Sequence, residues 1–237
     1  MVLVKLYGSD PTLDLAGEAG ARNLLREALS ADFLTELTEY FIMYTQQDIV
    51  RIDNFIPLHY QRSLNSFLLS PEFPLYKDAG TAYDPIERVT ADMPVYPDAA
   101  TREHPQLIHS FAARGEIASQ FWPRVAPLFF ELERQLGREC RILRCKLNLN
   151  TQDSSFSDSD HYPAHIDVAQ KDCVTAIYYV ADSDGDTRWY NDDMTELHRE
   201  TPRQGTLVYF PCRIRHAGSP PRTTQYRWVI NFNVKLV

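Results

Sequence analysis

The stretch RILRCKLNLN, residues 141–150, marks the point at which the sequence changes from helical to β-rich character. Further runs of β-branched and aromatic residues follow it, separated by turn residues. They are HYPAHIDVA (161–169), CVTAIYYVA (173–181), TRWYN (187–191), TELHR (195–199), GTLVYFP (205–211) and YRWVINFNVKLV (226–237). About seven short strands at close spacing predict an antiparallel sandwich or barrel.

The part before residue 141 is predicted to be mainly helical. Apolar residues recur at three- and four-residue intervals in most of it. This pattern predicts two helices within residues 18–46, one over residues 59–69 and one within residues 115–137, and a short β-like run spans residues 50–57. Pro123 and Pro127 should kink or divide the helix within 115–137, and Gly137 is expected to end it.

A long loop is predicted from Ser70 to Pro105, where Pro, Asp, Tyr and Gly are frequent and periodicity is lost. Loops of this length are usually functional lids or disordered linkers, and the interspersed aromatic residues favour a packed lid. The alternative is a surface excursion without a role.

The fold expected from these elements is α+β, with helices packed outside a C-terminal β-barrel. We expect a single domain over residues 1–237, with residues 1–140 forming a mainly helical extension and the lid loop. Residues 141–237 would form the barrel core. The sequence contains neither an internal repeat nor a low-complexity tract.

The net charge of −8 argues against nucleic acid and anionic membrane as partners, because both would repel the chain. The first residues do not resemble a signal peptide, and no apolar run approaches the ~20 residues that span a bilayer. We therefore expect a cytoplasmic protein. The four cysteines form no CxxC pair and are expected to be small buried residues rather than a zinc site.

A candidate metal site consists of His165, Asp167 and His216. Residues i and i+2 of an extended strand project from the same face, so His165 and Asp167 can bind one cation. His216 follows the run GTLVYFP and could reach the same point from a neighbouring strand. Two imidazoles and one carboxylate leave open positions on Fe(II) for a chelating co-substrate and O₂. A His-x-Asp pair also arises often by chance.

Arg227 begins the last β-run, eleven residues after His216. An arginine on the inner face of a barrel can hold a carboxylate through two parallel N–H···O bonds. The alternative is an exposed strand residue, and its large amphipathic neighbours Tyr226 and Trp228 leave its orientation open.

In order and spacing, these motifs resemble the 2-oxoglutarate/Fe(II) oxygenases, specifically the prolyl-hydroxylase-like branch. The resemblance runs from about residue 141 to residue 237 and rests on HID, CVTAIYYVA, SDGDTRWY, GTLVYFP, RIRHAG and YRWVINF. It implies a double-stranded β-helix (jelly-roll or cupin-like) fold, iron ligation by His165, Asp167 and His216, and 2-oxoglutarate and O₂ as co-substrates.

The resemblance also implies that Arg227 pairs with the C5 carboxylate of 2-oxoglutarate and that Tyr179 donates a hydrogen bond to the same group. From the residues alone, Tyr179 would be a core aromatic. Asn231, two inward positions past Arg227, is a further candidate for that pocket. The Tyr and Gly that the family often has before His-x-Asp are missing, so Lys146, Asn148 or Asn150 must bind the C1 end of the co-substrate, and Asn148 is our candidate.

The other histidines show no ligand spacing. His161 lies four residues before His165, but Pro163 interrupts the segment, and we expect His161 at the rim of the site, where it could contact substrate. His59, His104, His109 and His198 are expected on surfaces or lids.

The expected activity is hydroxylation of an unactivated C–H bond with release of succinate and CO₂. Halogenases of the superfamily that these motifs resemble lack the carboxylate ligand, so the presence of Asp167 disfavours halogenation. Desaturation and cyclisation use the same iron site and stay open. The substrate is expected to be a small molecule, such as an amino acid or biosynthetic intermediate, and a residue in a peptide or protein is the alternative. A non-catalytic β-barrel binding protein and a cupin-like metalloenzyme are the rival readings.

Overall fold

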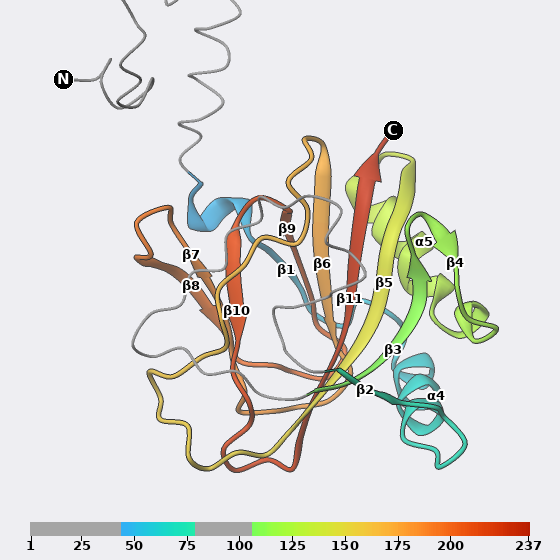
Figure 1. Ribbon diagram of the computed structural model, residues 1–237. Helices are drawn as coiled ribbons and strands as arrows, with labels where there is room; N and C mark the ends of the chain where they lie inside the picture. Colours follow the sequence, from blue (N-terminus) through green and yellow to red (C-terminus); the bar gives the residue numbers. More distant parts are fainter. Residues whose placement is uncertain (1–43, 79–105) are drawn as a thin grey trace, which may run out of the picture. The chain divides into compact units, whose positions relative to one another are not determined.

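Alternating apolar and polar residues build a large antiparallel sheet around the long C-terminal strands (Figure 1). The computed structural model describes residues 44–78 and 106–237. The strand order is β1-β9-β6-β11-β5-β3-β2, and β4 pairs with β3. The strands are β1 (Val50–Ile52), β2 (Tyr76–Asp78), β3 (Gln106–Ala113), β4 (Glu116–Ile117), β5 (Cys140–Thr151), β6 (Cys173–Tyr179), β9 (Leu207–Pro211) and β11 (Tyr226–Leu236).

A smaller antiparallel sheet has the order β10-β7-β8 and lies opposite the large one (Figure 1). It consists of β7 (Thr187–Tyr190), β8 (Glu196–Glu200) and β10 (Arg215–Gly218). A core cluster joins the two inner faces, with Ile177, Val208 and Val229 from the large sheet and Trp189 from the small one. Two facing antiparallel sheets around a shared interior form the predicted double-stranded β-helix.

Helices cover the outer face of the large sheet. Figure 1 shows α4 (Leu58–Leu68) and α5 (Ala126–Leu136) on the same side of it. Leu64 and Leu68 of α4 and Leu128 and Leu132 of α5 belong to a second core cluster, together with the outward-facing residues of the sheet. The expectation that helices pack outside the barrel is therefore confirmed for α4 and α5.

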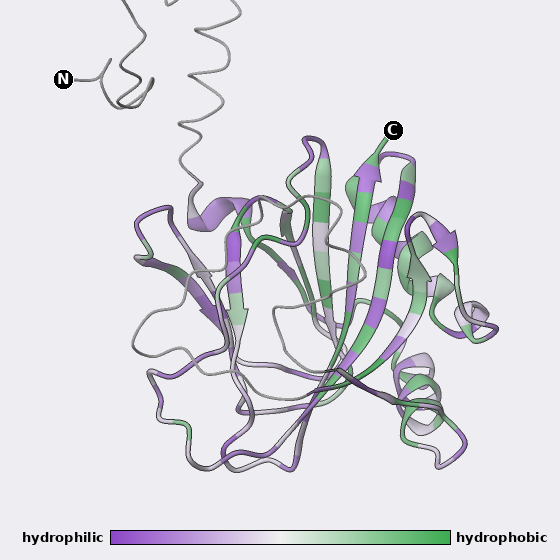
Figure 2. Ribbon diagram, in the orientation of Figure 1, coloured by the Kyte–Doolittle hydropathy of each residue, from purple (hydrophilic) through white to green (hydrophobic). Residues whose placement is uncertain are grey.

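The alternation along β11 decides which side chains enter the barrel. Trp228, Ile230, Phe232 and Val234 pack in the outer cluster, whereas Val229 packs in the inner one. Because successive side chains of a strand point to opposite faces, Arg227, Asn231 and Asn233 also point inward. The alternating hydropathy of β5 and β11 is visible in Figure 2. Arg227 is thus an inward residue, which its neighbours in sequence had left open.

The large sheet begins earlier in the chain than predicted. β1 pairs with β9 and β3 pairs with β5, so the barrel core is not confined to residues 141–237. β1 lies within the predicted β-like run, but β3 was missed because its mixed composition, QLIHSFAA, lacks a clean alternation. Tertiary pairing with β5 stabilises it as a strand.

Other local predictions were partly right. The expected division at the prolines is confirmed: a 3₁₀ helix spans Trp122–Arg124, and α5 follows it with Pro127 in its first turn. HYPAHIDVA is not a strand but a loop with isolated bridges. In the predicted loop from Ser70 to Pro105, Tyr76–Asp78 forms β2. Residues 79–105 of that loop, including His104, and the two helices predicted within 18–46, up to residue 43, lie outside the described residues.

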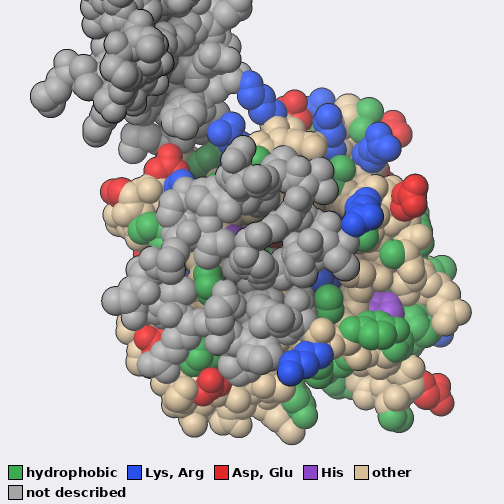
Figure 3. All heavy atoms as spheres, in the orientation of Figure 1, with side chains coloured by type: hydrophobic (Ala, Val, Ile, Leu, Met, Phe, Trp, Pro, Cys, Tyr) green, Lys and Arg blue, Asp and Glu red, His purple; other side chains and the backbone are tan. Residues whose placement is uncertain are grey.

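The described surface carries charges of both signs. Figure 3 shows Lys and Arg side chains interspersed with Asp and Glu on one face. All four cysteines are buried free thiols, as expected. Within residues 44–78 and 106–237, no helix has the length and apolarity needed to cross a membrane.

Candidate metal centre and co-substrate site

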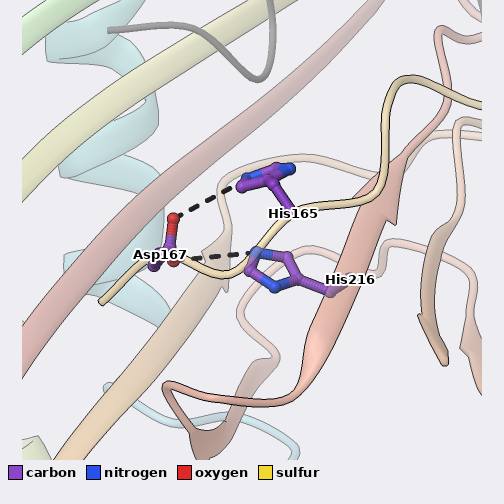
Figure 4. A group of neighbouring side chains, drawn as sticks. All are labelled: His165, Asp167 and His216. Carbon is purple, nitrogen blue, oxygen red and sulfur yellow. Dashed lines mark ion pairs between the residues drawn. The ribbon is translucent and has the colours of Figure 1, made fainter. Parts of the chain in front are cut away.

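The three predicted metal ligands converge in the structure. Figure 4 shows His165, Asp167 and His216 pointing toward one another, His216 from β10 and the other two from the loop before β6. A pair of backbone hydrogen bonds between His165 and His216, each 3.0 Å, aligns the two segments. One possible ligand atom from each residue lies within 4.8 Å of the other two.

Backbone carbonyls fix the tautomer of both imidazoles. His165 Nδ1 lies 3.0 Å from Pro163 O, and His216 Nδ1 lies 3.3 Å from Ile214 O. A carbonyl oxygen can only accept, so each Nδ1 carries the hydrogen and each Nε2 keeps its lone pair. The Nε2 atoms of His165 and His216 face Asp167, at 3.7 Å from Oδ1 and 3.6 Å from Oδ2 respectively. This is the arrangement a neutral His ligand needs.

Asp167 is buried and surrounded by donors. Arg144 Nη2 donates to Oδ1 at 2.7 Å. Three neutral side chains donate to Oδ2: Asn233 at 3.0 Å, and Asn231 and Thr175 at 3.2 Å each. Such a shell holds a carboxylate in a single orientation and keeps it available as an anionic ligand.

These contacts set the charge states of Asp167 and His216. Burial by itself would raise the pKa of Asp167, but the charge of Arg144, the two histidines and the Asn233 hydrogen bond outweigh it and hold that pKa well below its usual range. Burial lowers the pKa of His216 to about 4, although Asp167 partly opposes this. Asp167 is therefore ionised and His216 neutral at neutral pH, the forms that bind a divalent cation.

Arg227 forms a second polar centre inside the barrel. Its side chain is buried, and its Nε donates to Gly185 O at 2.7 Å while Nη2 donates to Thr187 Oγ1 at 2.7 Å. Burial lowers its pKa, yet a guanidinium remains charged at neutral pH. A Cβ at Gly218 would lie 3.3 Å from Arg227 Cζ, so this glycine leaves room beside the guanidinium.

Tyr179 and Arg227 both donate to the hydroxyl group of Thr187. Its phenol donates to Thr187 Oγ1 at 2.9 Å, and burial raises its pKa, so it stays protonated and can donate. Arg227 and Tyr179 are thus brought together, and their contact with 2-oxoglutarate stays a prediction. Thr187 was missed, because a threonine in the run TRWYN carries no sign of its partners.

Buried amide groups line the space between the two centres. Asn150 is opposite Arg227 and Asn148 is opposite Val229 in the β5–β11 pairing. Asn150 Nδ2, Asn148 Oδ1 and Asn231 Oδ1 are buried and have no hydrogen-bond partner among the described residues. Because such groups are costly when unsatisfied, they fit a bound molecule rich in oxygen atoms. The His and Asp donors likewise fit Fe(II).

The structure changes the interpretation of some predicted residues. Asn231 donates to Asp167, four residues along β11 from Arg227, and so lies at the ligand end of the barrel rather than beside Arg227. Asn148 is inward-facing as expected, and its contact with the co-substrate stays a prediction.

Two histidines expected at the surface or rim are buried instead. His161 packs against Tyr190. His109 bonds to Pro74 O and Ser119 Oγ, each at 2.8 Å, in a cluster of aromatic rings.

Arg144, Thr175 and Asn233 were not singled out from the sequence. The alternation along the strands could have indicated two of them. Asn233 is the next inward position after Asn231, and Arg144 is two residues before Lys146 on the same face of β5. A polar residue at an inward position of a strand is unusual enough to mark a site.

A family model described as "2OG-Fe(II) oxygenase superfamily" matches residues 151–235. Comparison with curated proteins finds no match. Among solved structures, an oxidoreductase of the 2OG-Fe(II) oxygenase family from Burkholderia pseudomallei is similar, with 15% identity, a TM-score of 0.54 and coverage of 86% of this chain and 90% of that one.

A prolyl hydroxylase from Trichoplax adhaerens, in complex with a hypoxia-inducible-factor peptide fragment, has 16% identity and a TM-score of 0.51, over 87% of this chain and 93% of that one. The non-heme alpha-ketoglutarate-dependent epimerase SnoN from nogalamycin biosynthesis has 14% identity and a TM-score of 0.50, over 79% and 77%. At these identities the likeness shows a shared fold.

The matched residues span the segment from the end of β5 to β11, which contains the triad and Arg227. Fold, matched segment and ligand chemistry agree. Residues 151–235 thus match the 2OG-Fe(II) oxygenase superfamily, and the fold and the candidate ligand set agree with that match.

Proposed function

We propose that this protein hydroxylates an unactivated C–H bond of a small molecule, such as an amino acid or biosynthetic intermediate. The overall reaction converts R–H, O₂ and 2-oxoglutarate into R–OH, succinate and CO₂. The observation that carries the proposal is the convergence of His165, Asp167 and His216 in the same barrel interior as the buried Arg227.

The residues of the chain have separate tasks in this proposal. His165, Asp167 and His216 hold Fe(II), which with bound 2-oxoglutarate supplies the activation of O₂. Arg227 binds the far carboxylate of the co-substrate through its charge and its N–H groups. Tyr179 and Thr187 orient that carboxylate by hydrogen bonds.

The apolar part of the interior would limit water at the reacting centre. Phe210 packs edge-on against His216, with ring centroids 5.0 Å apart, and Trp189 packs against Phe210 at 5.4 Å. Excluding water strengthens the polar contacts of the co-substrate and restricts side reactions.

The substrate class is supported by the polar inner wall. Lys146, Asn148 and Asn150 face inward on β5, and polar groups of this kind suit a small molecule with several oxygen or nitrogen atoms. A peptide residue is the alternative, since a similar fold occurs in the prolyl hydroxylase bound to a peptide.

We also propose that the chain forms a single domain and that this protein does not act on nucleic acid or membranes.

The test is succinate formation from 2-oxoglutarate with Fe(II) and O₂, measured across panels of amino acids, small biosynthetic intermediates and short peptides. We expect turnover stimulated by a member of the small-molecule panels. Turnover should disappear in His165→Ala, with circular dichroism unchanged. Stimulation by peptides alone would favour the alternative substrate class. Absence of 2-oxoglutarate binding to the metal-loaded protein would favour a non-catalytic barrel.

A further inference from the structure

Arg144 contacts the carboxylate that the proposed function assigns to the metal. It lies on β5 opposite Asn233 of β11, and its side chain is 13% exposed. Its Nη2 donates to Asp167 Oδ1 at 2.7 Å, and its Nε donates to Asn233 Oδ1 at 2.8 Å. Asn233 in turn donates to Asp167 Oδ2 at 3.0 Å. The three side chains form a closed ring of hydrogen bonds, which fixes the guanidinium in place.

The two oxygens of Asp167 are held differently. Each oxygen of an ionised carboxylate has about two acceptor positions. From the described residues, one donor reaches Oδ1 and three reach Oδ2. The contact at Oδ1 is short and charge-assisted, whereas the three contacts at Oδ2 are neutral and between 3.0 and 3.2 Å. The bond from Arg144 is therefore the strongest of these contacts, and it places a positive charge beside the carboxylate.

One of the donors at Oδ2 has another acceptor at hand. Thr175 Oγ1 lies 3.2 Å from Asp167 Oδ2 and also 3.2 Å from Cys212 Sγ. A hydroxyl has one hydrogen and can turn it from the carboxylate to the sulfur. The Thr175 bond to Oδ2 can therefore be exchanged at small cost, whereas breaking the bond at Oδ1 would separate Arg144 from the carboxylate.

We infer that Arg144 is a positioning residue whose guanidinium, bonded to Oδ1, partly neutralises the Asp167 carboxylate and so sets the charge at the metal site. This rests on the proposed function, in which Asp167 is a metal ligand. The consequence follows from charge. A guanidinium beside the site repels a cation and attracts a dianion. Arg144 therefore weakens binding of the metal alone and strengthens binding of the dianionic co-substrate to the loaded site.

The experiment compares two dissociation constants in wild type and Arg144→Met. Co(II), a redox-stable probe, is titrated into metal-free protein and followed by visible absorption. 2-Oxoglutarate is then titrated into the Co(II)-loaded protein by calorimetry. Because the variant lacks the guanidinium charge, we expect the Co(II) dissociation constant of Arg144→Met to fall about tenfold and that of 2-oxoglutarate to rise about tenfold.

The opposite directions separate positioning from mere support of the fold. A residue that only stabilised the barrel would weaken both binding steps when removed. Weaker binding of both probes, or no change in either, would overturn the inference.

Two further variants serve as controls. Arg141→Met removes an exposed arginine of the same strand, and both constants should stay at wild-type values. Arg144→Lys keeps the charge and should restore much of the 2-oxoglutarate affinity. If thermal melting shows that Arg144→Met does not fold, Arg144→Gln, which keeps a donor but not the charge, replaces it under the same expectations.

The wild-type titration tests the proposed function separately. Wild-type protein that binds no Co(II) contradicts the metal site itself. Wild-type protein that binds Co(II) and 2-oxoglutarate, together with an Arg144→Met variant that does the same with unchanged constants, contradicts only the role of Arg144.

Discussion

Single charged residues lie inside this barrel, where proteins ordinarily bury apolar groups. Arg227, Asp167 and Arg144 are buried or nearly so, and each has a charged or polar partner at short distance. Burying a charge is costly unless it is paired and hydrogen-bonded. Their placement inside the barrel therefore indicates that they bind a ligand. Two predictions concern single residues of this kind.

Replacing Arg227 should remove the anchor for the co-substrate. In Arg227→Met we expect the dissociation constant of 2-oxoglutarate from metal-loaded protein to rise at least about 30-fold, which corresponds to about 2 kcal/mol for a charge-assisted contact. Calorimetry measures it. Arg222→Met, which removes a surface arginine paired with Asp158, is the control. Unchanged affinity in Arg227→Met would place the co-substrate elsewhere.

Metal-free protein should lose stability in mild acid because of His216. Burial lowers its folded pKa to about 4 from a reference of 6.5. Between these values the unfolded chain binds more protons, so stability falls as pH falls. For this group alone, the loss from pH 7 to pH 5 is about 2 kcal/mol. Asp167 does not contribute in this window, because its stabilisation is lost only below the unfolded carboxyl pKa.

Urea unfolding at both pH values, in the presence of a chelator, measures this effect in wild type and His216→Gln. Burial also lowers the pKa of His109, but His109 is present in both proteins and cancels in the comparison. An equal loss of stability in the two proteins would show that His216 is not the group responsible.

Among the elements, α5 joins the outer core to the sheet and ends in a defined way. Gly137 caps it in the left-handed region at φ 64°, and a Cβ added there would meet no atom within 4 Å. The requirement for glycine is therefore one of backbone conformation alone. Leu132 of the same helix is fully buried, whereas Phe130 is 59% exposed.

The capping glycine should be worth about 1 kcal/mol. Gly137→Ala places a side chain in a conformation that L-residues avoid, so the free energy of unfolding should fall by about 1 kcal/mol. Gly137→Asn should lose less, because Asn tolerates this region. Urea denaturation measures both, and equal stability of wild type and Gly137→Ala would contradict the cap geometry.

The buried face of α5 should be far more sensitive than its exposed face. Leu132→Ala should cost about 2–5 kcal/mol through lost burial and the cavity that it leaves. Phe130→Ala should stay within about 0.5 kcal/mol of wild type. Comparable losses in the two variants would mean that α5 does not pack on the sheet as described.

At the scale of the whole molecule, the site exists only when both sheets are assembled. His216 comes from the small sheet, Arg227 from the large sheet, and Asp167 from the loop between β5 and β6. A ligand that binds these groups together binds the folded state and not the unfolded chain. Metal binding must therefore stabilise the fold.

This coupling can be measured by thermal unfolding. At a Co(II) concentration about 100 times its dissociation constant, the folded state gains about 2.7 kcal/mol, and the melting temperature should rise. In His165→Ala the rise should be lost. A melting temperature that does not respond to metal in wild type would contradict a site shared by the two sheets.

The sequence by itself determined the β-rich C-terminal part, the helix over residues 59–69 and the stop at Gly137, and it singled out the three candidate metal ligands. These features depend on local periodicity, on backbone preferences and on ligand chemistry that spacing along the chain reveals. Arg227 and Tyr179 came from a resemblance in order and spacing.

Only the tertiary structure decided which inward side chains meet. It shows that β3 belongs to the sheet, that Arg227 points inward and that Asn231 contacts Asp167. It also adds four residues to the candidate site, namely Arg144, Thr175, Thr187 and Asn233. The physical reason is that strand register and the facing of two sheets depend on pairing between segments far apart in the chain. No local pattern contains that information.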